Sequence, residues 1–247
     1  MVTEQIDWLQ TPTGQYLLEW ERARFDAALT DVFGYHALQI GLLGINALAA
    51  NRMSHRWLAL TAGCPQGALA PTLVVDSTAL PFAEASLDLV VLPHTLELSG
   101  DPHATLREVQ RVLVHEGRIA ITGINPVSLW GLGRRRRSGL GQFFLSDAGT
   151  FIGHRRLRDW LRLLEFELES ISFGCYRPAM RGERAQARFG WMERVGARWW
   201  PIFGAAYFIV AVKRARGARL LGQAWKAAPV VAATPAPVAN REPKGSH

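Results

Sequence analysis

Two glycines, Gly41 and Gly44, follow a short apolar segment in the stretch HALQIGLLGIN at residues 36–46. A glycine turn at the end of a strand lets the backbone approach a bound nucleotide, because glycine has no side chain. The residues between and after these glycines are bulky and apolar, as Leu43 and Ile45 illustrate. The pattern leaves two interpretations open: a turn that holds a cofactor, or a tight turn that only packs.

Other chemistries have little support in the sequence. The seven histidines show no metal-ligand spacing, and His115-Glu116 lacks a second histidine four residues after the first. The sequence contains no Walker loop, no nucleophile elbow and no paired cysteine set, since Cys64 and Cys175 stand far apart. We therefore expect no metal. The opening MVTEQIDWLQ does not resemble a secretory signal, so a cytoplasmic location is expected.

Strand-like and helix-like segments alternate along the chain and would position these residues. Apolar strands are expected at residues 36–40, 56–63, 72–76, 87–92, 117–125, 166–175 and 206–213. Helices are expected at 14–29, from about 46, from Asp101-Pro102, and at 155–166. Continuous apolar strands are typical of a parallel sheet covered on both faces, so the pattern predicts a doubly wound α/β fold. Ligands of such sheets bind beyond the carboxyl ends of the strands, near the reversal of strand order.

Charge is distributed unevenly over the chain. Residues 1–123 contain 7 basic and 13 acidic residues, whereas residues 124–247 contain 21 basic and 8 acidic residues. A basic second half indicates a surface that meets an anion, or a general preference for arginine, since only three bases are lysines. The apolar run at 199–212 is too short to span a bilayer and is typical of a buried strand or an interfacial patch. We expect one domain at 1–226 and a disordered Ala/Pro-rich tail at 227–247.

Two longer stretches carry a family resemblance. VVDSTALPFAEASLDLVVLPHTLEL at 74–98 and DPHATLREVQRVLVHEGRIAITGINP at 101–126 resemble the middle of class I S-adenosylmethionine-dependent methyltransferases. The resemblance covers about residues 35–125, and most of 14–226 is similar to a bacterial branch of the methyltransferase type 11 kind. It implies a Rossmann-like sheet, mostly parallel with an antiparallel last strand and helices on both faces. Residues 14–125 would form the cofactor half and 126–226 a basic acceptor or cap half.

The resemblance also implies which residues meet S-adenosylmethionine. The superfamily has an acidic residue and then Gly-x-Gly-x-Gly after its first strand; here Gln39 and Gly41 match the start of this motif. Asp76 stands where members bind the adenine amino group, and Thr61 is the nearest polar group to the usual ribose-binding acid. The cofactor-binding residues expected on this basis are Gln39, Gly41, Gly44, Thr61, Asp76, Ser77, Thr78, Pro93 and Thr95.

The acceptor side has fewer candidates. His94 follows the fourth strand, beside the place of the transferable methyl group, and would be a catalytic base or a wall of that site; otherwise it is a hydrogen-bonded loop residue. Asn125 and Trp130 are expected at the rim of an acceptor pocket. The run Arg134, Arg135, Arg136 and Arg137 is either a solvated loop or an anion-binding segment.

Two functions follow from these features. The first is an S-adenosylmethionine-dependent methyltransferase that acts on a small-molecule, lipid-like or amphipathic acceptor. The second is a methyltransferase-like protein that has lost the cofactor and binds an anionic partner, nucleic acid or an acidic membrane surface, through its Arg-rich second half. The altered glycine loop motivates the second function, whereas Asp76 and the 87–92 segment favour the first.

Overall fold

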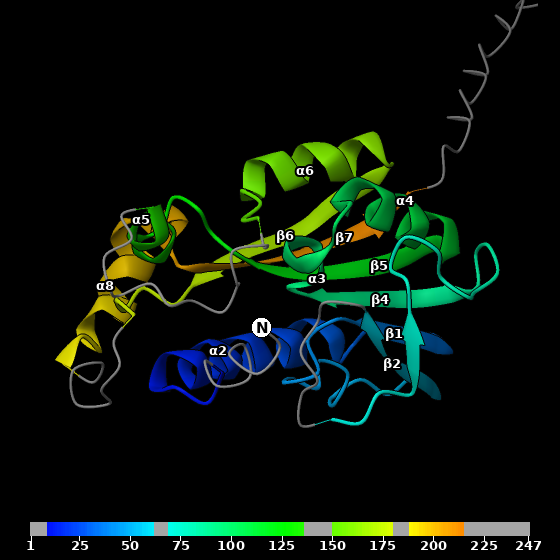
Figure 1. The fold of residues 1–247 in the computed structure, drawn as a ribbon, viewed down its shortest axis with the longest axis horizontal. Coiled ribbons are helices and arrows are strands. Elements are labelled where there is room, and N and C mark those ends of the chain that lie inside the picture. Colours follow the sequence, from blue (N-terminus) through cyan, green and yellow to red (C-terminus); the bar gives the residue numbers. More distant parts are fainter. Residues whose placement is uncertain (1–8, 62–68, 136–149, 180–187, 215–247) are drawn as a thin grey trace, which may run out of the picture. The chain divides into compact units, whose positions relative to one another are not determined.

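The computed structural model describes residues 9–61, 69–135, 150–179 and 188–214. Seven strands form one sheet in the order β3-β2-β1-β4-β5-β7-β6 (Figure 1). The first five strands are parallel, whereas β7 runs antiparallel to its neighbours β5 and β6. The expected mostly parallel, doubly wound sheet with an antiparallel last strand is confirmed. The strands are β1 (His36–Ile40), β2 (His55–Thr61), β3 (Leu73–Val75), β4 (Leu87–Pro93), β5 (Leu113–Ile124), β6 (Phe166–Gly174) and β7 (Ala206–Lys213).

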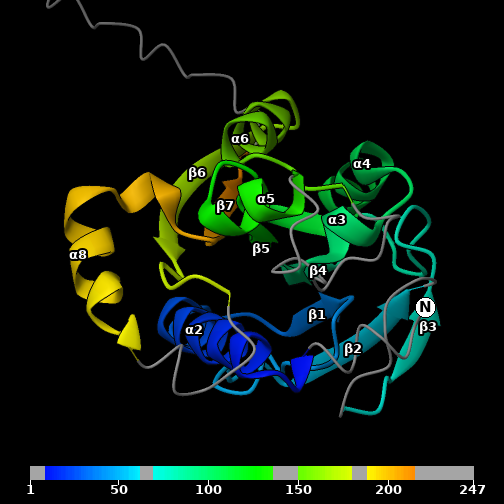
Figure 2. The same ribbon diagram turned by 60° about the vertical axis from the view of Figure 1, so that its left-hand side comes forward.

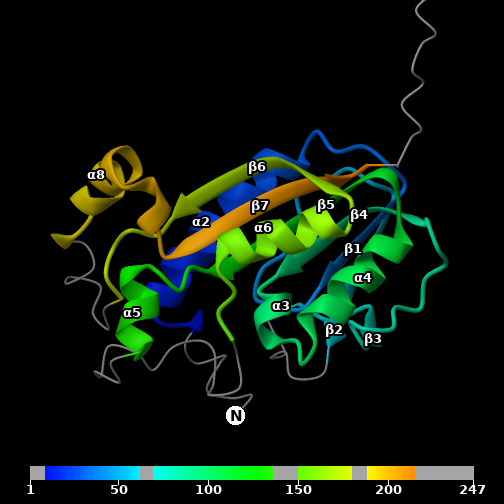
Figure 3. The ribbon, with the colours of Figure 1, turned by 90° about the horizontal axis from the view of Figure 1, so that it is seen from above.

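Helices cover both faces of this sheet (Figures 1 and 3). α2 (Pro12–Leu29) packs on one face, and α4 (Pro102–Val112) and α6 (His154–Leu163) pack on the other. Successive strand residues point to opposite faces, so Ala120 of β5 joins the core under α2 while Ile119 and Ile121 join the core under α4 and α6. Buried apolar strands are therefore sandwiched between two helical layers, as the sequence predicts.

Local side-chain bonds fix where the helices begin. The Asp101 carboxylate accepts the backbone N–H of Ala104 at 2.9 Å, and Pro102 occupies the first turn, so the predicted start of α4 is confirmed. α2 begins in the same way, because the Thr11 hydroxyl accepts the N–H of Gly14 at 3.2 Å.

The helix expected from about Asn46 does not form. The chain makes turns after β1, in which the N–H of Ala49 donates to the Asn46 carbonyl and that of Asn51 donates to the Leu48 carbonyl. The Gln39 side chain explains the difference, because it binds three backbone groups between residues 42 and 47 and curls this segment around itself. An Ala-rich segment with good helix propensity is thus overridden by a tertiary contact.

The remaining described elements are α3 (Thr95–Leu98), α5 (Leu129–Arg135), α8 (Trp191–Trp199) and the 3-10 helix η1 (Pro201–Phe203). α5 and α8 lie at the same end of the sheet in Figures 1 and 3. Within the described ranges, no helix is both long and apolar enough to cross a membrane. The chain divides into two compact units, residues 1–216 and 217–247, and the predicted tail at 227–247 lies outside the described residues.

Candidate cofactor and acceptor site

The strand order reverses between β1 and β4, which are hydrogen-bonded neighbours. From β1 the chain passes outward to β2 and β3, and then returns to β4 on the other side of β1. The segments after the parallel strands β1, β2, β3 and β4 therefore meet at one border of the sheet, here called the carboxyl edge. Ligands of doubly wound sheets bind at this place, and the sequence-predicted residues from Gln39 to Thr95 all lie in or beside these segments.

Gly41 is required by the geometry of the first turn. Its φ of +106° lies in the left-handed region, and a Cβ at this position would collide with the hydroxyl of Thr95. That hydroxyl donates to the Ile40 carbonyl, and the Gly41 N–H donates to the Ala59 carbonyl at 3.0 Å. Gly41 thus allows Thr95 to close the space between the ends of β1 and β4.

The Gln39 amide braces the turn from within. Its Nε2 donates to the carbonyls of Leu42 at 3.1 Å and Ile45 at 2.7 Å, and its Oε1 accepts the N–H of Ala47 at 2.9 Å. The side chain is fully buried, so both donor hydrogens and the acceptor oxygen serve the protein itself. A carboxylate could not replace it, because a carboxylate has no hydrogen to donate.

The bulky residues of the turn point in two directions. Leu42 and Ile45 are fully buried in the core under α2. Leu43 instead packs against Leu60 of β2 and the partly buried Leu98 of α3. Of these three bulky residues, Leu43 is the one that packs beside the end of β2, at a position where the resemblance implies a glycine. Gly44 is in contact range of Leu9, since a Cβ there would lie 3.1 Å from its side chain.

Asp76 is exposed at the end of β3. Its Oδ1 accepts the Thr78 backbone N–H at 2.8 Å and the Thr78 hydroxyl at 2.7 Å, and these hydrogen bonds lower the pKa of the carboxyl group. The group is therefore ionised and faces solvent at neutral pH. Its neighbour Ser77 is buried and pairs with the Thr105 hydroxyl at 3.0 Å, which anchors the turn to α4.

The other predicted cofactor residues are parts of the sheet or its border. Pro93 ends β4, and its carbonyl accepts the N–H of Leu42 at 3.4 Å. Thr61 ends β2 and is almost fully buried. The structure thus brings the predicted residues to one edge, where Asp76 supplies their one ionisable side chain, which is exposed.

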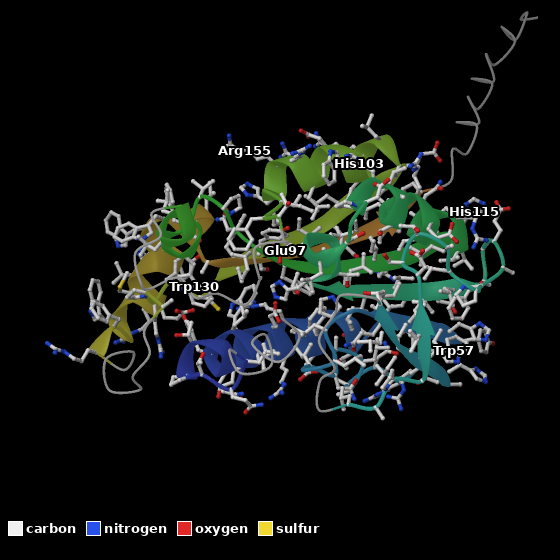
Figure 4. The ribbon with its side chains drawn as sticks, viewed as in Figure 1. Trp57, Glu97, His103, His115, Trp130 and Arg155 are labelled. Atoms are coloured by element: carbon white, nitrogen blue, oxygen red, sulfur yellow. The ribbon has the colours of Figure 1, made fainter. Side chains whose placement is uncertain are left out.

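His94 lies at the centre of a buried charged cluster, here called the Glu21–His94–Glu97 cluster. Its Nε2 lies 2.7 Å from Glu21 Oε1 of α2, and its Nδ1 lies 2.7 Å from Glu97 Oε2 of α3. The second Glu97 oxygen accepts the Ile124 N–H of β5 at 2.7 Å. All three side chains are at most 2% exposed, and Figure 4 labels Glu97 at α3, in the middle of the molecule.

The protonation of this cluster argues against a catalytic base. Burial alone would lower the pKa of His94, but the charges and hydrogen bonds of Glu21 and Glu97 outweigh it and raise the pKa to about 10. Burial also raises the pKa of Glu97. His94 is therefore an imidazolium at neutral pH whose two nitrogens both donate, and it has no lone pair to accept a proton. The contacts of His94 fit the alternative interpretation of a hydrogen-bonded loop residue, and a catalytic role for it stays a prediction.

Sequence reasoning missed Glu21 and Glu97. A signal for Glu21 was present, since it stands between Leu17 and Phe25 at four-residue spacing on the buried face of α2. A charged residue on such a stripe indicates a buried partner, because an unpaired buried charge is costly. Nothing in the sequence identified His94 as that partner, 73 residues away.

Asn125 and Trp130 are buried rather than placed on an open rim. Asn125 Nδ2 donates to the carbonyls of Ile202 at 2.7 Å and Gly204 at 3.0 Å, so it ties the end of β5 to η1. Trp130, which belongs to α5 and is labelled in Figure 4, donates its indole N–H to the Arg177 carbonyl at 2.8 Å. Both residues thus have structural roles here, and contact with an acceptor stays a prediction.

The predicted anion-binding arginines are only partly within the described chain. Arg134 and Arg135 belong to α5, although their side chains are not described, and Arg136 and Arg137 lie outside the described residues. In the described ranges, no cluster of three or more histidine, cysteine or acidic side chains has a geometry that could hold a metal ion.

Comparisons with known proteins agree with this geometry. Residues 34–121 match the family model described as "Methyltransferase domain". The "uncharacterized protein YafS" of Escherichia coli is 36% identical over 163 residues, which are 65% of each chain. The match thus spans just under two thirds of that relative's length.

Solved structures share the fold at low sequence identity. A Thermotoga maritima structure described as an S-adenosylmethionine-dependent methyltransferase, possibly a histamine N-methyltransferase, has a TM-score of 0.61 at 16% identity and covers 87% of this chain and 96% of its own. A putative methyltransferase in complex with the Haloferax volcanii Trm112 activator has a TM-score of 0.57 at 19% identity, covering 82% and 93%. At these identities the likeness concerns the fold alone.

Proposed function

We propose that the chain is a class I S-adenosylmethionine-dependent methyltransferase that transfers a methyl group to a small or amphipathic acceptor, because residues 34–121 match the methyltransferase-domain model. The observation that carries the proposal is the position of Asp76. This residue places an ionised, solvent-facing carboxylate at the end of β3, on the same carboxyl edge as the Gly41 turn. A carboxylate there accepts a hydrogen bond from the exocyclic amino group of an adenine.

The residues present fit the adenine end of S-adenosylmethionine better than its amino-acid end. Asp76 offers an accessible acceptor, and the apolar side chains of Leu43 and Leu60 supply a surface of the kind that an aromatic ring packs against. The polar side chains nearest the glycine turn, Gln39 and Thr95, are committed to backbone carbonyls. We therefore assign Asp76, with Thr78 and Ser77 fixing its turn, as the cofactor-recognition group.

The chain's own residues would bind and orient rather than provide strong acid–base chemistry. When bound, S-adenosylmethionine supplies an electrophilic methyl group on its sulfonium. The Gly41–Thr95 contact and the Gln39 brace keep the carboxyl edge rigid, which favours alignment of donor and acceptor. His94 is fully buried and both of its ring nitrogens are in hydrogen bonds with Glu21 and Glu97, so we assign it no proton-accepting role in the transfer. This favours acceptors that attack through a lone pair already available at neutral pH.

A specific observation favours a second function. Leu43 occupies the place of a glycine, its side chain is fully buried, and the segment after it forms turns instead of a helix. These features suit a methyltransferase-like protein without cofactor, whose partner would be anionic and bound by the Arg-rich second half. Cofactor titration separates the two functions.

The test is calorimetric titration of S-adenosylmethionine and S-adenosylhomocysteine into the wild type and Asp76→Ala. The wild type is expected to give saturable heat, and Asp76→Ala to bind about tenfold or more weakly, since hydrogen bonds to charged groups are worth about 1.5–3 kcal/mol. Asp101→Ala is the matched control, because Asp101 is also an exposed aspartate that accepts a backbone N–H but lies at the start of α4. Absence of heat from the wild type with both ligands at millimolar concentration would exclude the cofactor.

A further inference from the structure

A group of large apolar side chains stands in solvent on α8 and η1. Trp199 is 72% exposed and Phe203 is 52% exposed. Trp191, Trp200 and Ile202 are also exposed, each by less than 60%. We call this group the α8–η1 surface; it consists of Trp191, Trp199, Trp200, Ile202 and Phe203. Figure 2 shows α8 at the periphery, beyond β6. Exposed aromatic side chains gathered on one short segment indicate a binding surface.

The segment that carries this surface is firmly attached to the sheet by its opposite side. Gly196 of α8 packs against Tyr176, where a Cβ would lie 2.5 Å from the ring, and Gly204 packs on the Gly174 backbone. The Tyr176 hydroxyl donates to the Pro201 carbonyl at 2.8 Å, and Asn125 donates to the Ile202 carbonyl at 2.7 Å. Glycines thus face inward and the aromatic residues outward, so the surface is presented by ordered backbone.

The charged side chains of this segment also differ between its inner and outer sides. Glu193 turns inward, where its carboxylate accepts the Tyr16 hydroxyl and, at 3.3 Å, the Tyr176 N–H. Arg188, Arg194 and Arg198 are exposed. The outward charges of the segment, over the residues described, are therefore positive and lie on the same stretch of chain as the exposed tryptophans.

We propose that the α8–η1 surface docks the protein onto a lipid bilayer that contains anionic headgroups. Tryptophan and phenylalanine insert at the boundary between headgroups and acyl chains, and each arginine near an anionic surface adds about 1 kcal/mol of attraction. The docking is peripheral, because the described helices are too short or too polar to cross a membrane. This inference does not rest on the cofactor and holds for either function above.

Charge also favours a bilayer over a second copy of the chain. In a two-fold dimer the same basic surface forms both sides of the interface, so the arginines of both copies, among them Arg194 and Arg198, would gather in one interface. Like charges brought together at an interface are unfavourable, whereas anionic headgroups neutralise them. The exposed Leu129 and Leu132 of α5 lie at the same end of the molecule and extend the apolar character there.

The test is co-flotation of the full chain with vesicles of phosphatidylcholine, with and without phosphatidylglycerol. The wild type is expected to float with the mixed vesicles and to bind pure phosphatidylcholine at least about tenfold more weakly. Trp199→Ala combined with Phe203→Ala is expected to weaken binding by about tenfold or more, because the inserted aromatic area is lost. Arg194→Glu with Arg198→Glu should weaken binding to the mixed vesicles by about fivefold or more per residue.

Two control variants test whether binding depends on the α8–η1 surface itself or on any exposed apolar or charged side chain. Phe33→Ala with Leu163→Ala removes side chains that are 77% and 80% exposed elsewhere, and Arg52→Glu with Arg107→Glu reverses exposed charges elsewhere. Both controls should bind mixed vesicles within about twofold of the wild type. Three results would overturn the proposal: no flotation of the wild type, equal loss in the controls, or a dimer in gel filtration that the Trp199 and Phe203 changes dissociate.

Discussion

At the scale of single residues, Gln39 shows how one side chain determines the form of a loop. Its amide satisfies two carbonyls and one N–H that no regular element satisfies, in a place without solvent. A buried polar group costs free energy when it lacks a partner, and here three backbone groups share one partner. The brace therefore replaces the helix that the composition of residues 46–50 favours.

Gln39→Glu tests this brace. At neutral pH the carboxylate would face the Leu42 and Ile45 carbonyls without a hydrogen to donate, so the free energy of unfolding should fall by about 3 kcal/mol. Urea unfolding at pH 7 measures the loss, and lower pH should reduce it because a protonated glutamate can donate. Gln110→Glu, on the half-buried side of α4, should change stability by less than about 0.5 kcal/mol. Equal stability of Gln39→Glu and wild type would contradict the brace.

At the scale of elements, some features were predictable from the sequence and others were not. Apolar runs identified the strands, and Asp101-Pro102 identified the start of α4, because these signals are local. The loop after β1 was not predictable, because its form depends on where the Gln39 side chain points. The sequence predicted which residues gather at the carboxyl edge. It did not predict which of them remain accessible, because accessibility depends on the packing of Thr95 onto Gly41.

The attachment of α8 gives a prediction at this scale. Alanine is the better helix former by about 1 kcal/mol, but a Cβ at Gly196 would lie 2.5 Å from the Tyr176 ring. The steric cost should exceed the gain in helix propensity, so Gly196→Ala is expected to lower the free energy of unfolding by about 2 kcal/mol. Gly100→Ala is the control, since nothing lies within 4 Å of a Cβ there and the change should be neutral or slightly stabilising. A higher melting temperature for Gly196→Ala than for the wild type would contradict the close contact between Gly196 and Tyr176.

At the scale of the whole molecule, the Glu21–His94–Glu97 cluster joins parts that are distant in the sequence. Glu21 comes from α2, His94 and Glu97 come from the segment after β4, and the Ile124 N–H belongs to the end of β5. The next residue, Asn125, binds η1. The buried cluster thus stands at the start of a continuous series of contacts from the helix on one face of the sheet to the α8–η1 surface.

The same cluster makes global stability depend on pH. The pKa of His94 is raised from 6.5 to about 10 in the folded chain, so its stabilisation is fully present below pH 6.5 and is lost as the pH rises through 10. At 1.36 kcal/mol per pKa unit, the loss is up to about 5 kcal/mol. Glu97 acts in the same direction, because its pKa is also raised in the folded chain. Urea unfolding of the wild type from pH 6.5 to 10 should therefore show a decline in the free energy of unfolding. His94→Gln should flatten this decline, whereas His103→Gln, at an exposed position of α4, should leave it unchanged. An unchanged slope in His94→Gln would show that the imidazolium does not hold the cluster together.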